Sequence, residues 1–130
     1  MTNAAQRTIL LAEDDRVLRE TLARRLTDEG YTVFTVEDGQ KGLDHARNHQ
    51  PDLILLDIKM PQMTGYEMLK TLREEGSWGA EVPVVFLTNI TPSSDDEVDD
   101  IQALKPTDYI VKGDTSLDDF VTKVRAYLKD

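Results

Sequence analysis

The sequence predicts a doubly wound α/β domain, in which helices cover both faces of a parallel sheet. Short aliphatic runs alternate with longer segments of helical spacing five times along the chain, and this alternation is typical of repeated strand–helix units. The runs are almost continuously apolar, as expected for strands buried on both faces, and right-handed crossovers join such strands in parallel. The chain has 130 residues, which is the length of one domain.

The predicted strands are short runs rich in β-branched and aliphatic residues, which pack well on a pleated surface. In chain order they read TILLA (8–12), YTVFTV (31–36), DLILL (52–56), VPVVFL (82–87) and DYIV (108–111). The segment GSWGAE (76–81) is expected to lengthen the connection into the fourth strand. The remaining segments are expected to form the helices.

The five predicted helices occupy residues 16–29, 39–48, 65–75, 94–104 and 117–128. In the first, leucines recur every four residues at Leu18, Leu22 and Leu26, and Gly30 ends the segment. The last carries an apolar stripe that begins at Phe120. The fourth has few apolar residues, and its prediction depends on an acidic first turn within DDEVDD (95–100).

Composition excludes several classes of function. The formal net charge is -10, and an acidic surface repels nucleic-acid phosphates and anionic lipids. The chain has no cysteine, which excludes thiol catalysis and cysteine-ligated zinc and fits a reducing compartment. The sequence contains no secretory signal and no apolar run long enough to span a membrane. We therefore expect a cytoplasmic protein with no direct nucleic-acid or membrane partner.

Polar residues follow four of the five predicted strands. The carboxyl ends of parallel strands meet at one edge of the sheet, where sites form. This edge is therefore expected to gather side chains that are far apart in sequence: Glu13, Asp14 and Asp15 after the first strand, Asp57 after the third, Thr88 and Asn89 after the fourth, and Lys112 after the fifth. Asp15 also precedes a predicted helix and is expected to cap it.

Asp57 directly follows an apolar run of four residues. A buried strand at this position would hold the side chain of a nucleophile in a fixed place. Several carboxylates at one edge disfavour one another's ionisation unless a cation compensates. An all-oxygen ligand set suits Mg²⁺, which takes one or two carboxylates and keeps several waters. A carboxylate so placed can attack a phosphoryl group, with Lys112 and Thr88 interacting with the phosphoryl oxygens. These residue types favour phosphoryl transfer to Asp57.

The sequence resembles a receiver domain of the two-component response regulators from about residue 8 to residue 128. The matching stretches are ILLAEDD (9–15), DLILLDIKMPQMTGYEML (52–69), PVVFLT (83–88) and DYIVK (108–112). The resemblance implies a flavodoxin-like fold with five parallel strands in the order 2-1-3-4-5 and five helices. It also implies that residues 1–130 form one receiver domain, a phosphoprotein of signal transduction that catalyses only its own phosphorylation and dephosphorylation.

The resemblance assigns roles to seven residues. Those expected at the phosphorylation site are the phosphoacceptor Asp57, the acidic pair Glu13 and Asp14, and the lysine Lys112. Asp14 is favoured over its neighbour as the direct Mg²⁺ ligand, and Lys59 is expected to offer its backbone carbonyl to the ion. The conformational switch is expected to use the hydroxyl of Thr88 and the ring of Tyr109.

The resemblance also implies partners. A histidine kinase or a phosphotransfer protein is expected to supply the phosphoryl group. A downstream protein or a second copy of the chain is expected to contact the face built from the fourth helix, the fifth strand and the fifth helix (94–104, 108–111 and 117–128). The leading interpretation is a stand-alone receiver, because the chain ends directly after the last helix, and a receiver excised from a longer protein stays an alternative.

Two other classes of function remain open at this stage. One is a Mg²⁺-dependent aspartyl-phosphate phosphatase or hydrolase, which usually needs a second carboxylate near the nucleophile, whereas Lys59 stands two residues past Asp57. The other is a pseudo-receiver that only binds partners, against which the intact Asp57, Thr88 and Lys112 argue. Departures from the family pattern are Asn89 after the threonine, Gly113 after the lysine and Pro106 before the fifth strand.

Two histidines lie outside this expected site. His45 and His49 are four residues apart on a predicted helix, a spacing that could place two imidazoles on one metal ion. No third ligand is evident near them in the sequence. They are therefore expected to be surface histidines.

Overall fold

Five strands form one parallel sheet in the computed structural model, which describes residues 7–88, 106–113 and 115–128. The strands are β1 (Thr8–Ala12), β2 (Thr32–Val36), β3 (Leu53–Asp57), β4 (Val84–Thr88) and β5 (Asp108–Val111). Their order is β2-β1-β3-β4-β5, and all four pairings are parallel. The predicted α/β class and strand order are confirmed.

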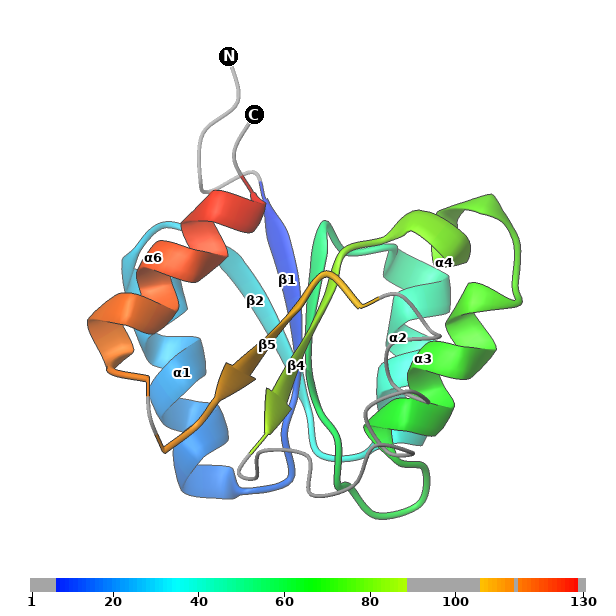
Figure 1. Cartoon of the computed structure of the whole chain (residues 1–130), viewed down its shortest axis with the longest axis horizontal. Helices are drawn as coiled ribbons and strands as arrows, with labels where there is room; N and C mark the ends of the chain where they lie inside the picture. The colour runs from blue at the N-terminus through cyan, green and yellow to red at the C-terminus, as the bar shows by residue number, and fades with distance from the viewer. Residues whose placement is uncertain (1–6, 89–105, 114, 129–130) are drawn as a thin grey trace.

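Helices cover both faces of this sheet (Figure 1). They are α1 (Arg16–Asp28), α2 (Gly39–His49), α3 (Gly65–Arg73), α4 (Ser77–Glu81) and α6 (Leu117–Tyr127). Helices α1 and α6 lie on one face, and α2, α3 and α4 lie on the other (Figure 1). The fourth predicted helix, 94–104, and Asn89 lie outside the described residues.

The sheet separates two hydrophobic clusters because successive side chains of a strand point to opposite faces. In β3, Leu53 and Leu55 belong to the cluster under α1 and α6, whereas Ile54 and Leu56 belong to the cluster under α2 and α3. All five residues of β3 are buried. This central strand is therefore fixed from both sides up to its last residue, Asp57.

Local hydrogen bonds explain where the helices begin. Asp15 caps α1 by accepting a hydrogen bond from the Leu18 backbone N–H at 3.2 Å, which confirms the capping role expected from the sequence. At the start of α3, Thr64 and Glu67 form a reciprocal capping box. These caps fix the first residues of α1 and α3, the helices that follow β1 and β3 in the chain.

Several boundaries differ from the prediction. Asp57 and Thr88 are the last residues of β3 and β4 and do not follow them. Strand β4 begins at Val84, later than expected, because Val82 ends α4 by donating its N–H to the Trp78 carbonyl oxygen at 2.9 Å. The connection expected at 76–81 contains the short helix α4. In the described ranges, no helix is long and apolar enough to cross a lipid bilayer.

Candidate functional site

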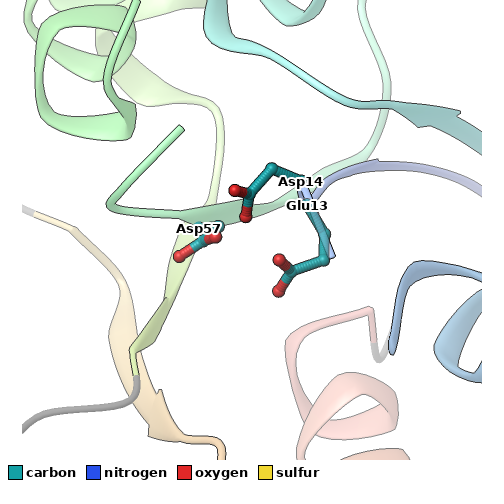
Figure 2. A group of neighbouring side chains, drawn as sticks. All are labelled: Glu13, Asp14 and Asp57. Atoms are coloured by element: carbon teal, nitrogen blue, oxygen red, sulfur yellow. The ribbon is translucent and has the colours of Figure 1, made fainter. Parts of the chain in front are cut away.

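The candidate site lies at the carboxyl ends of β1 and β3, where the order of the strands reverses. The chain moves outward from β1 to the edge strand β2 and then returns to β3 on the other side of β1. Ligands of doubly wound folds bind at such a switch point. Glu13 and Asp14 follow β1, Asp57 ends β3, and the three carboxyl groups lie together there (Figure 2).

Asp57 is a buried carboxylate, with 6% of its surface exposed. Its strand is held in register by β1 on one side and by β4, where it pairs with Leu87, on the other. The loop after it folds back closely, since the Gly65 N–H donates to the Ile58 carbonyl oxygen at 2.9 Å. A Cβ at Gly65 would clash with the Asp57 backbone carbonyl. The position of Asp57 is therefore closely constrained by its strand and by the loop that follows it.

Glu13, Asp14 and Asp57 form a cluster of oxygen ligands. One carboxylate oxygen from each lies within 4.8 Å of those of the other two. Glu13 is fully buried, whereas Asp14 is exposed. This arrangement leaves one side of the cluster open to solvent, and hard oxygen ligands of this kind fit a hydrated Mg²⁺ ion.

Lys112 reaches the same cluster from the end of β5. Its Nζ forms an ion pair with Glu13 and lies 3.3 Å from Asp57 Oδ1. Its backbone N–H donates to the Thr88 carbonyl oxygen at 2.7 Å, which holds the ends of β4 and β5 together. The predicted convergence of residues about a hundred positions apart is therefore present in the structure.

The cluster perturbs the ionisation of Asp57. Its pKa is raised from 3.8 to about 7. Burial is the largest cause, followed by hydrogen bonding with Asp14 and Glu13 and by the charge of Glu13, while Lys112 lowers the pKa. A cation bound next to a partly protonated carboxylate favours the ionised form of that carboxylate. The residues present thus fit a divalent metal ion.

The remaining predicted residues surround this cluster. The Lys59 side chain is exposed, and its backbone N–H lies 3.4 Å from Asp57 Oδ1. Thr88 is half-buried at the end of β4. Tyr109 is half-buried on β5, and its ring stacks on Phe86 with centroids 6.2 Å apart. Asp15 lies next to the cluster, but its side chain caps α1.

Sequence reasoning missed Arg19. From the first turns of α1, its Nη1 donates to the backbone carbonyl oxygens of Glu13 at 2.8 Å and Asp14 at 3.4 Å. The guanidinium thereby supports the segment that carries the acidic pair. The available signal was the position of Arg19 one turn after the cap Asp15, and that spacing also fits an ordinary surface arginine.

A comparison with protein families gives one assignment. The model of the response regulator receiver domain matches residues 9–125. The response regulator MprA of Mycobacterium sp. (strain KMS) is 36% identical over 121 residues, which cover 93% of this chain and 50% of that protein. ArlR of Staphylococcus aureus (strain MW2) is 35% identical over 123 residues, with 93% and 52% covered. The chain spans about half the length of the curated relatives it matches.

Solved structures give the same result. The chemotaxis response regulator CheY4 of Vibrio cholerae has a TM-score of 0.82 at 27% identity, with 93% of this chain and 98% of that chain covered. The receiver domain of the sensor histidine kinase PA1611 from Pseudomonas aeruginosa PAO1 has a TM-score of 0.84 at 26% identity, with 95% and 98% covered. That structure holds a magnesium ion coordinated in its active site cleft.

Proposed function

The chain belongs to the family of response regulator receiver domains, and on this basis we propose that Asp57 accepts a phosphoryl group in a Mg²⁺-dependent reaction. A histidine kinase or a phosphotransfer protein supplies that group. We also propose that residues 1–130 form one receiver domain, with its core at about 8–128. The observation that carries the proposal is the buried Asp57 carboxylate, within 4.8 Å of two further carboxylates and 3.3 Å from Lys112 Nζ.

In the proposed reaction an Asp57 carboxylate oxygen attacks phosphorus. The bond from phosphorus to the donor histidine nitrogen breaks, and the nitrogen keeps the electron pair. The product is an aspartyl phosphate that water later hydrolyses. Because β3 is buried and Gly65 closes the loop behind Asp57, the nucleophile keeps its position during attack.

The metal and the lysine have separate roles. Glu13, Asp14, Asp57 and the Lys59 backbone carbonyl would hold Mg²⁺, which supplies charge neutralisation at the phosphoryl oxygens. Lys112 provides a second positive charge from the β5 side and exchanges its contact with Asp57 for one with the phosphoryl group. A dication held by these residues would also favour the ionised form of Asp57 near neutral pH, against the raised pKa of the metal-free cluster.

Phosphorylation would be transmitted through Thr88 and Tyr109. The phosphoryl group offers hydrogen-bond acceptors to the Thr88 hydroxyl, and a shift of β4 would change the stacking of Tyr109 on Phe86. The output surface we propose includes β5 and α6, and it contacts a downstream protein or a second copy of the chain. No observation favours the alternative hydrolase, since the position two past Asp57 is the exposed Lys59.

Incubation with Mg²⁺ and a small phosphodonor tests the proposal. The intact mass of the wild type should rise by one phosphoryl group, and the adduct should be stable in acid and labile in base. Asp57→Asn should gain no mass. Asp15→Asn is the matched control, because it removes a neighbouring carboxylate and keeps a capping side chain, and it should be labelled like the wild type.

A further inference from the structure

A cluster of three aromatic rings lies at the β2 edge of the sheet, away from the acidic site. His45 and His49 occupy the last turns of α2, and Phe34 is on the edge strand β2. The histidine rings stack with centroids 4.4 Å apart and planes at 27°. The Phe34 ring lies 4.8 Å from the His45 ring and 6.0 Å from the His49 ring. Both imidazoles therefore stand on one side of the helix, next to each other.

One nitrogen in this cluster has no interaction that accounts for its burial. Among the described residues, His45 Nε2 is buried and has no hydrogen-bond partner. Leaving a buried polar atom unsatisfied costs free energy, and such an atom needs a specific explanation. His45 as a whole is only half-buried, and His49, which stacks on it, is exposed at the helix end.

We propose that His45 and His49 together bind a transition-metal dication of the Cu²⁺, Ni²⁺ and Zn²⁺ group. Two histidines four apart on one helix place two imidazoles on one ion, and neutral imidazole suits these metals. The ion would satisfy His45 Nε2, which has no hydrogen-bond partner within the described part of the chain. The negative end of the α2 dipole also favours a cation at this position. Water completes the coordination shell.

The charged groups near this end of α2 do not compete for the site. Arg47 lies between the two histidines in sequence and forms ion pairs with Glu75 and Asp44. Phe34 covers the rings from β2 and offers no charge. The pKa of His45 is lowered by burial first and by His49 second, which keeps this ring in its metal-binding form at neutral pH. The two rings are stacked in the structure, so at least one of them must turn about its side-chain bonds before both can face one ion.

Copper titration tests the proposal. Cu²⁺ binds nitrogen ligands most tightly in the divalent series, and an excess of Mg²⁺ keeps the acidic cluster filled. The wild type should bind one Cu²⁺ at this site, with electron paramagnetic resonance showing two coordinated imidazole nitrogens. His45→Ala and His49→Ala should each weaken binding by at least tenfold and remove the two-nitrogen signal.

A double variant provides the matched control. His49→Ala combined with Gln50→His keeps two histidines but places the second one off the shared face, so the two-nitrogen signal should stay absent. The proposal is overturned if Cu²⁺ affinity falls less than tenfold in either single variant, or if the two-nitrogen signal returns in the double variant. Either result would indicate that the rings only pack against one another. If His45→Ala does not fold, the exposed position His49→Ala decides alone.

Discussion

Replacing Asp57 with asparagine should stabilise the metal-free protein, and the gain should increase with pH. Asp57 is buried beside two other carboxylates, and its pKa in the folded protein is about 7, compared with 3.8 for an unperturbed group. The folded state therefore holds a proton that the unfolded chain releases between these values. The contribution of Asp57 to the free energy of unfolding is fully present below pH 3.8 and is lost as the pH rises through 7. Asparagine does not ionise and avoids that loss.

The size of the gain follows from the shift in pKa. A rise from 3.8 to about 7 corresponds to roughly 4 kcal/mol at 1.36 kcal/mol per pKa unit. This net shift already includes the attraction between Lys112 and the Asp57 carboxylate, which lowers the pKa. We therefore expect Asp57→Asn to raise the free energy of unfolding by up to about 4 kcal/mol at pH 8 and by under about 1 kcal/mol at pH 4.

Urea denaturation in EDTA at pH 4, 6 and 8 measures this difference. Asp15→Asn is the control, because it exchanges one exposed capping side chain for another and leaves the buried carboxylate of Asp57 in place. The gain at Asp57 should also shrink when millimolar Mg²⁺ replaces EDTA, since the ion stabilises the carboxylate. An effect independent of pH, or one largest at pH 4, would refute the claim that burial and carboxylate repulsion dominate at Asp57.

Three further predictions concern the residues around Asp57. Asp14→Ala should weaken Mg²⁺ binding at least tenfold in calorimetric titrations, whereas Asp15→Ala should change it less than twofold, and equal losses would contradict the assignment of Asp14 as ligand. Lys112→Met should slow labelling by a small phosphodonor at least tenfold. The substitution should not weaken Mg²⁺ binding, because it removes a positive charge that competes with the metal ion for the carboxylates. Weaker Mg²⁺ binding in this variant would show that Lys112 organises the carboxylates instead. Gly65→Ala should lower the free energy of unfolding by about 2–3 kcal/mol, because its Cβ would meet the Asp57 backbone, and an unchanged urea midpoint would rule out that close approach.

The sheet was predictable because its strands are nearly pure apolar runs. Strand β3 carries four consecutive aliphatic residues, and so short an apolar run is typical of a strand buried on both faces. The site followed from the topology, because carboxyl ends of parallel strands meet at one edge. What the apolar pattern could not show is that Asp57 itself belongs to the strand, since this depends on its pairing with Leu87 of β4.

Helix α4 was not predictable from local sequence. Its five residues include Gly79 and follow Gly76, which has a φ of 109°. Two glycines in so short a segment are typical of a loop. The side chain of the last residue of α3 holds the helix in place. Arg73 Nη1 donates to the carbonyl oxygens of Gly79 and Val82, both at 2.9 Å. Side-chain bonds of this kind to irregular backbone leave no periodic signal in the sequence.

The division of roles within the acidic stretch also required coordinates. Three consecutive acidic residues follow β1, and in sequence they are nearly equivalent. In the structure Glu13 is buried against Lys112, Asp14 is exposed beside Asp57, and Asp15 caps α1. Their different directions arise from the turn between β1 and α1, which Arg19 supports through two backbone carbonyls.

The central claim is that Asp57 carries the phosphoryl group, and chemical trapping tests it most directly. Borohydride reduces an aspartyl phosphate to homoserine, a change that peptide mass spectrometry locates to one residue. After treatment with Mg²⁺ and a small phosphodonor, followed by borohydride, the peptide spanning residues 52–59 should contain homoserine at position 57 and an unmodified Asp52. Homoserine at another acidic position, or a fully labelled protein with unmodified Asp57, would contradict the account.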